Sequence, residues 1–125
     1  MEEPNSLFEK FLRTFQKGEV IFEDGATGAE MFIVHSGRIK LLKKTTGGEE
    51  KTLALLGPGE FFGEMSLIDG TPRSTSAVAE EPGTNLIALD ITKFIYLIQQ
   101  HPYFSFTIMG KLCQRLREAN VSIIG

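Results

Sequence analysis

The most informative stretch of the chain is residues 57–77, which read GPGEFFGEMSLIDGTPRSTSA. Gly63 in this stretch allows a tight turn and a close approach of the backbone to a ligand. Residues 64–68 predict about one and a half turns of helix, which Asp69-Gly70 ends. The first turn of a helix presents unpaired backbone N–H groups, and such groups suit a phosphate.

Two charged side chains in the same stretch predict an anion-binding site. Glu64 lies close to Phe62 and Met65 in a mostly apolar run, where a carboxylate needs a partner such as a ligand hydroxyl or an arginine. Arg73 is expected to open a strand of small residues, and its planar guanidinium fits two phosphate oxygens. The hydroxyl residues 74–76 are small and leave space beside it. These features together predict a site for a sugar phosphate.

The stretch resembles the phosphate-binding cassette of the cyclic-nucleotide-binding domain family, which includes catabolite activator proteins and regulatory subunits of cyclic-AMP-dependent protein kinase. The motifs Phe62-Gly63-Glu64 and Pro72-Arg73-Ser74 carry this resemblance at fixed spacing, within a cassette of residues 62–77. Similarity to the first hairpins and the last two helices of the family extends it over nearly the whole chain. The stretches concerned are residues 25–28, 32–37, 93–102 and 115–120.

The resemblance implies a cyclic nucleotide as the ligand and assigns roles to individual residues. Arg73 would hold the exocyclic phosphate oxygens, and Glu64 would accept the ribose 2′-hydroxyl. Near the base, Ala119 offers no hydrogen bond, whereas Asn120 offers a donor and an acceptor. The implied ligand-binding residues are Phe62, Gly63, Glu64, Met65, Ser66, Pro72, Arg73, Ser74, Thr75 and Asn120.

The choice between cyclic AMP and cyclic GMP does not follow from the residue after the arginine. In eukaryotic members of the family a hydroxyl there favours cyclic GMP, and this chain has Ser74. The bacterial catabolite activator also has a serine there and uses cyclic AMP. Cyclic AMP is the expected ligand because the overall pattern looks bacterial, and cyclic GMP is the alternative.

Outside the cassette, the patterns predict a mostly β fold with flanking helices in a single domain, residues 1–125. A capping box at Ser6 and Glu9 and an apolar face predict an N-terminal helix within residues 1–17. Short apolar runs between glycines predict strands across residues 18–90. The resemblance implies that they form a β-barrel of the jelly-roll, or double-stranded β-helix, type. A change to helical spacing predicts two helices in residues 91–125, separated at His101-Pro102.

Two features keep alternative interpretations open. Glu64 and Arg73 could form a buried ion pair with no ligand, which would make the chain a structural or interaction domain. An apolar stripe on the last helix could either pack on its own domain or form a homodimer seam. The stripe consists of Ile108, Leu112, Leu116, Ala119 and Ile123.

Composition excludes several other functions. The chain has 125 residues, a net charge of −3 and a sequence pI of about 5.4, so a nucleic-acid-binding surface is not expected. No apolar run is long enough for a membrane span. A single cysteine, Cys113, and two histidines favour a reducing, cytoplasmic compartment without a metal site.

No catalytic motif is present, so an enzyme is not expected. A catabolite-activator type of transcription factor would need a helix-turn-helix after the last helix. The chain stops at Gly125 without one. DNA binding by this chain alone is therefore not expected, although it could be a piece of such a regulator.

Overall fold

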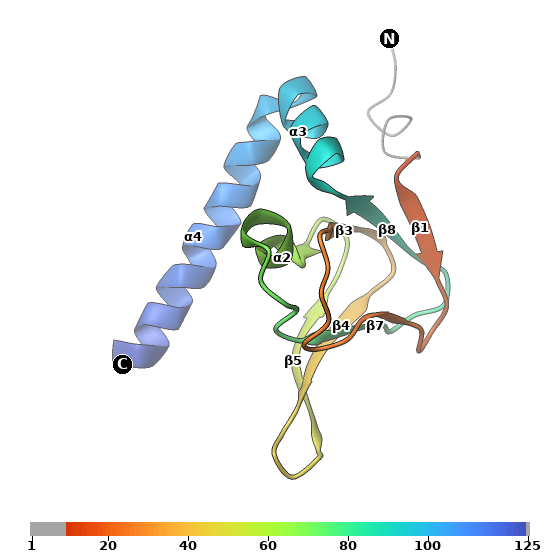
Figure 1. Ribbon diagram of the computed structural model, residues 1–125, viewed down its shortest axis with the longest axis vertical. Helices are drawn as coiled ribbons and strands as arrows, with labels where there is room; N and C mark the ends of the chain where they lie inside the picture. The colour runs from red at the N-terminus through yellow and green to blue at the C-terminus, as the bar shows by residue number, and fades with distance from the viewer. Residues whose placement is uncertain (1–9, 125) are drawn as a thin grey trace. The chain divides into compact units, whose positions relative to one another are not determined.

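The computed structural model describes residues 10–124, and their side chains through residue 119. The chain divides into two compact units, residues 1–91 and residues 92–125. The first unit contains the strands and one short helix, and the described residues of the second lie mainly in two helices (Figure 1).

The strands form two four-stranded antiparallel sheets, with strand orders β1-β8-β3-β6 and β2-β7-β4-β5. This arrangement confirms the predicted mostly β fold with flanking helices. The strands are β1 Leu12–Phe15, β2 Val20–Phe22, β3 Met31–Ser36, β4 Ile39–Lys44, β5 Glu50–Leu56, β6 Phe61–Phe62, β7 Ser76–Ala79 and β8 Thr84–Leu89.

Small and large side chains alternate in the core between the sheets. Ala77 and Ala79 of β7 are buried in this core and leave room for aromatic rings from both sheets. Phe22, Phe32 and Phe62 fill that room, with ring centroids 5.3 to 6.0 Å apart. Phe32 and Phe62 are fully buried, which is worth about 1.5–3 kcal/mol for each ring, and Phe22 is partly buried. This aromatic cluster also forms the floor beneath the cassette described below.

The predicted N-terminal helix is wrong over residues 12–15, which form β1. The capping-box residues Ser6 and Glu9 lie outside the described residues. Four residues of β1 pair with β8, so a sheet neighbour supplies the backbone hydrogen-bond partners that a helix would otherwise supply. The spacing of Leu12 and Phe15 fits a helical face, but in the strand they alternate to opposite faces.

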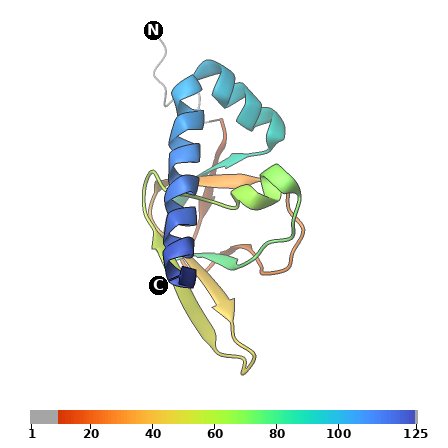
Figure 2. The same ribbon diagram turned by 90° about the vertical axis from the view of Figure 1, so that its left-hand side faces the viewer.

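The β4–β5 hairpin turns at Gly47-Gly48. The Gly48 N–H donates to the Thr45 carbonyl at 2.9 Å, and the Thr45 N–H donates to the Glu49 carbonyl at 2.7 Å. Gly48 has a φ of +85°, a conformation that glycine adopts without strain. The hairpin projects beyond the other strands of its unit (Figure 2).

The second unit contains helices α3, Ile91–Gln100, and α4, Pro102–Ile124, in which α3 starts at the last residue of the first unit. The predicted break at His101-Pro102 is confirmed. Phe94 and Phe104 make an edge contact across it, with ring centroids 6.1 Å apart. No helix in residues 10–124 is both long and apolar enough to span a membrane.

Candidate functional site

The centre of the predicted cassette is the short helix α2, Glu64–Asp69, which directly follows β6. Glycines in left-handed conformations bound it, Gly63 with a φ of +81° and Gly70 with a φ of +73°. The Gly70 N–H donates to the Ser66 carbonyl at 3.1 Å and closes the last turn. The short helix predicted for this segment is therefore confirmed.

The loop after α2 is held by Asp69. Its Oδ1 accepts hydrogen bonds from the Thr71 N–H at 3.0 Å and from the Thr71 hydroxyl at 2.6 Å. These two bonds lower the pKa of the Asp69 carboxyl. The turn they form leads the chain from the end of the helix back to Pro72 and Arg73.

The backbone of Arg73 is fixed against the loop that follows β2. Its N–H donates to the Ala26 carbonyl at 2.8 Å, and its carbonyl accepts from the Gly25 N–H at 2.7 Å. The expectation that Arg73 opens a strand is wrong, because β7 begins only at Ser76. The loop at residues 25–26, and not a neighbouring strand, takes up the hydrogen bonds of Arg73.

The guanidinium of Arg73 is buried, with 6% of the residue exposed. Its Nη1 donates to the Glu30 carbonyl at 2.8 Å and to the Gly63 carbonyl at 3.1 Å. Its Cζ lies 4.2 Å from the ring centroid of Phe22 and 5.9 Å from that of Phe32. The aromatic floor and the two carbonyls therefore orient a buried cation.

The other edge of the guanidinium, formed by Nε and Nη2, can still donate a hydrogen bond to a ligand. Nε of Arg73 is buried and has no hydrogen-bond partner within residues 10–119. Gly28 lies against this edge, since a Cβ at residue 28 would be 2.4 Å from Nη2 and 2.6 Å from Nε. Burial lowers the pKa of Arg73, and the charge of Glu30 partly opposes the shift. An anion on this edge would satisfy both the unpaired donor and the buried charge.

The other predicted residues around Arg73 fall into a buried and an exposed group. Glu64 and Ser66 are buried on α2, whereas Met65 between them is exposed. Pro72 and Ser74 are exposed, and Thr75 is half-buried.

The other two predicted site residues, Phe62 and Asn120, lie neither on α2 nor in the loop at residues 70–75. The Phe62 ring stacks on Phe32 within the hydrophobic core, where it supports the floor of the cassette. Asn120 lies on α4 in the second unit, and its side chain lies outside the described residues.

Sequence reasoning missed three contributors to the Arg73 environment: Phe22, Gly28 and Glu30. Phe22 ends β2, and Gly28 and Glu30 lie between β2 and β3; all three are more than forty positions before Arg73 in the chain. Gly28 belongs to a stretch that resembles the family, but its contact with Arg73 follows only from the fold. Phe22 and Glu30 carry no local signal that links them to a phosphate.

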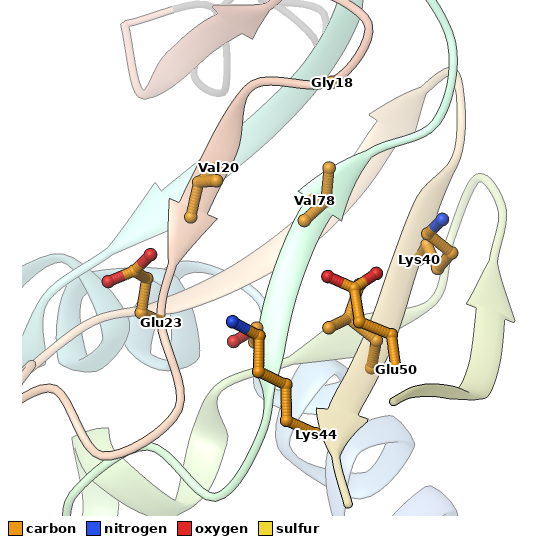
Figure 3. Close-up of a pocket in the computed structure, with 9 residues that line it drawn as sticks. Gly18, Val20, Glu23, Lys40, Lys44, Glu50 and Val78 are labelled. Atoms are coloured by element: carbon orange, nitrogen blue, oxygen red, sulfur yellow. The ribbon is translucent and has the colours of Figure 1, made fainter. Parts of the chain in front are cut away.

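A separate shallow cavity of about 300 Å³ lies on the outer face of the β2-β7-β4-β5 sheet (Figure 3). Ser76 and Val78 of β7 line it, whereas the alternate residues Ala77 and Ala79 face the core. Lysine and glutamate side chains surround its apolar floor. Neither Arg73 nor Glu64 lines this cavity, so it is distinct from the cassette.

Metal-ligating side chains do not gather in the part of the chain that the structure describes. That part holds no group of three or more histidine, cysteine, aspartate and glutamate residues that could hold a metal ion.

Known proteins share sequence and fold with this chain. The cyclic AMP receptor protein of Thermus thermophilus is 44% identical over 111 residues, covering 89% of this chain and 51% of that protein. The crystal structure of the Thermus thermophilus catabolite activator protein superposes with a TM-score of 0.83 at 42% identity, covering 95% of this chain and 56% of that one.

A more distant relative is the cGMP-dependent protein kinase egl-4 of Caenorhabditis briggsae. It is 31% identical over 85 residues, covering 67% of this chain and 11% of the kinase. The chain thus spans about half the length of its Thermus relative and a small part of the kinase. The sequence profile described as "Cyclic nucleotide-binding domain" matches residues 12–101, which include both sheets and the whole cassette. Because this profile matches more than half of the chain and the Thermus relative is 44% identical over 89% of it, the chain belongs to the cyclic nucleotide-binding domain family.

Proposed function

We propose that the chain binds cyclic AMP at the cassette and acts as a regulatory sensor module, not as an enzyme. The observation that carries the proposal is the buried guanidinium of Arg73, whose Nε has no hydrogen-bond partner within residues 10–119. A cyclic phosphate on the Nε–Nη2 edge would supply the missing acceptor and a compensating charge. Glu64, buried at the start of α2, is the proposed acceptor for the ribose 2′-hydroxyl.

The preference for cyclic AMP is supported by similarity. The Thermus relative at 44% identity is named as a cyclic AMP receptor protein, whereas the kinase named for cyclic GMP is 31% identical over a shorter match. Ser74 is exposed and offers its hydroxyl to either nucleotide.

Calorimetric titration with cyclic AMP, cyclic GMP and linear 5′-AMP tests the proposal. We expect cyclic AMP to bind with a dissociation constant of about 1 μM or tighter, cyclic GMP to bind more weakly, and 5′-AMP to bind weakest. Tighter binding of cyclic GMP would reverse the assigned preference. An absence of binding by either cyclic nucleotide to folded protein would instead identify the chain as a ligand-free interaction domain.

We further propose that ligand binding is read out through movement of α3 and α4, with α4 pairing against a second copy of the chain. Leu116 on α4 is 63% exposed and Ala119 is exposed, although both belong to the apolar stripe. Such a stripe at near-heptad spacing fits a helix of the same kind.

Sedimentation velocity tests the pairing with Leu116→Glu and a matched control, Gln114→Glu. Leu116→Glu would bury an unpaired charge in the seam and is expected to raise the dimer dissociation constant about tenfold or more. Gln114 is exposed and lies outside the stripe, so its variant is expected to behave as the wild type. A monomeric wild type would contradict the proposal, as would equal dissociation of the two variants.

A further inference from the structure

Glu30, the residue before β3, contacts two arginines through two different groups. Its backbone carbonyl accepts the hydrogen bond from Nη1 of Arg73 at 2.8 Å. Its carboxylate accepts a two-point hydrogen bond from Arg13 on β1, with Oε1 3.0 Å from Nη1 and Oε2 2.5 Å from Nη2. Glu30 therefore joins β1 to the cation at the centre of the cassette.

The carboxylate of Glu30 has opposing effects on the ligand-free site and on the site with a bound phosphate. Its negative charge favours the charged form of Arg73. The same charge would repel a phosphate that binds to Arg73, because the charge of the ligand lies close to that guanidinium. Arg13 supplies the positive charge that neutralises the carboxylate.

The geometry of the Arg13 pair also restricts where the carboxylate can lie. A two-point arginine–carboxylate pair has a defined orientation. While both oxygens are bonded to Arg13, they are not available to compete with a phosphate for the open edge of Arg73. That edge includes Nε, which has no hydrogen-bond partner within residues 10–119.

We propose that Arg13 is a positioning residue of the nucleotide site, acting through Glu30: it neutralises the Glu30 carboxylate and keeps it from competing with the ligand phosphate for Arg73. The inference rests on the proposed function, because it requires a phosphate ligand at Arg73. It adds β1 and the start of β3 to the elements that set affinity.

If Arg13 only stabilised the fold, its loss would lower the stability of the protein and leave the affinity for cyclic AMP unchanged. The side chains of Arg13 and Glu30 are 48% and 26% exposed, and ion pairs with this exposure contribute little to folding stability. Strand β1 is also held by its register with β8, from Leu12 opposite Ile87 to Phe15 opposite Thr84. Loss of the Arg13 side chain should therefore leave the sheet intact while changing binding.

The test measures cyclic AMP affinity by calorimetry for wild type, Arg13→Gln, Glu30→Gln and the double variant, at low and high salt. Arg13→Gln is expected to bind about fivefold more weakly at low salt, with a smaller loss at high salt. Glu30→Gln is expected to bind as tightly as wild type or tighter. The double variant is expected to match Glu30→Gln, because the charge that Arg13 neutralises is gone.

Arg38→Gln is the matched control. Arg38 forms a comparably exposed ion pair with Glu81, 3.9 Å apart, and its side chain has no hydrogen bond or ion pair with Arg73 or Glu30 among those described. Its variant is expected to bind as the wild type does. Thermal unfolding of all variants without ligand is expected to differ little from wild type.

Two results would overturn the inference while leaving the proposed function intact. One is unchanged affinity in Arg13→Gln, and the other is a double variant that binds as weakly as Arg13→Gln. Failure of wild type itself to bind a cyclic nucleotide would overturn the proposed function, and the inference with it.

Discussion

Arg73→Ala is expected to weaken cyclic AMP binding by about 30- to 3,000-fold, the largest effect on affinity of any substitution in the chain. Removal of one partner from a buried, charge-assisted hydrogen bond costs about 2–5 kcal/mol, and each 1.4 kcal/mol is about tenfold in affinity. The guanidinium is buried, and its Nε–Nη2 edge lies against Gly28. Calorimetric titration of the variant beside wild type measures the loss directly.

The stability of a second variant, Arg73→Met, separates a ligand-binding arginine from a structural one. Methionine keeps much of the apolar volume over Phe22 but removes the charge that burial disfavours. The variant also removes the hydrogen bonds that the Glu30 and Gly63 carbonyls accept from Nη1, and relief of the buried charge offsets part of that loss. The free energy of unfolding without ligand should therefore stay within about 2 kcal/mol of wild type.

A structural ion pair between Arg73 and Glu64 predicts the opposite pattern. Breaking such a pair leaves a buried carboxylate without compensation and costs about 3–5 kcal/mol. Urea unfolding of Arg73→Met, with and without cyclic AMP, distinguishes the two cases. A large loss of stability in the ligand-free variant would favour the structural interpretation. Near-neutral stability with no stabilisation by cyclic AMP would favour the ligand-binding one.

The cassette was predictable from the sequence because its chemistry is local. Gly63, the helix that follows it and Arg73 lie within eleven residues. Their turn-forming and charged side chains therefore mark the site without knowledge of the fold. The helix at residues 64–69 and its glycine termination were predicted almost to the residue, since a helix this short depends mainly on its ends.

The environment of Arg73 was not predictable, because it is assembled by tertiary contacts. Phe22 and Glu30 reach the guanidinium only after β2 and β3 are placed in their sheets. The same limit explains the error at residues 12–15, where pairing with β8 overrode a helix-like spacing. Strand pairing joins residues far apart in the chain, and no local pattern specifies the partner.

Gly63→Ala is expected to destabilise the ligand-free protein by about 2–3 kcal/mol. Gly63 has a φ of +81°, and a residue with a Cβ in the left-handed region costs about 1–2 kcal/mol. The added Cβ would lie 2.9 Å from Nη1 of Arg73 and 3.2 Å from the Glu30 carbonyl oxygen. It would therefore crowd the two groups whose hydrogen bond holds the guanidinium in place.

Gly48→Ala isolates the backbone part of this effect. Gly48 has a φ of +85°, and a Cβ there would meet no atom within 4 Å. Its variant should lose only the conformational cost of about 1–2 kcal/mol and should keep wild-type affinity for cyclic AMP. Gly63→Ala should lose more stability in urea unfolding and, because Arg73 is displaced, bind about tenfold more weakly or worse.

The two alanine variants together link the conformation of one glycine to the function of one arginine. If Gly63→Ala lost stability only as far as Gly48→Ala and bound normally, the close approach at Gly63 would be irrelevant to binding. If Gly63→Ala lost more stability than Gly48→Ala and also lost affinity for cyclic AMP, the backbone at residue 63 would help to orient Arg73. The second outcome would place the left-handed turn and the guanidinium in one binding unit, in which the carbonyl of Gly63 holds the cation and its missing side chain leaves the cation room.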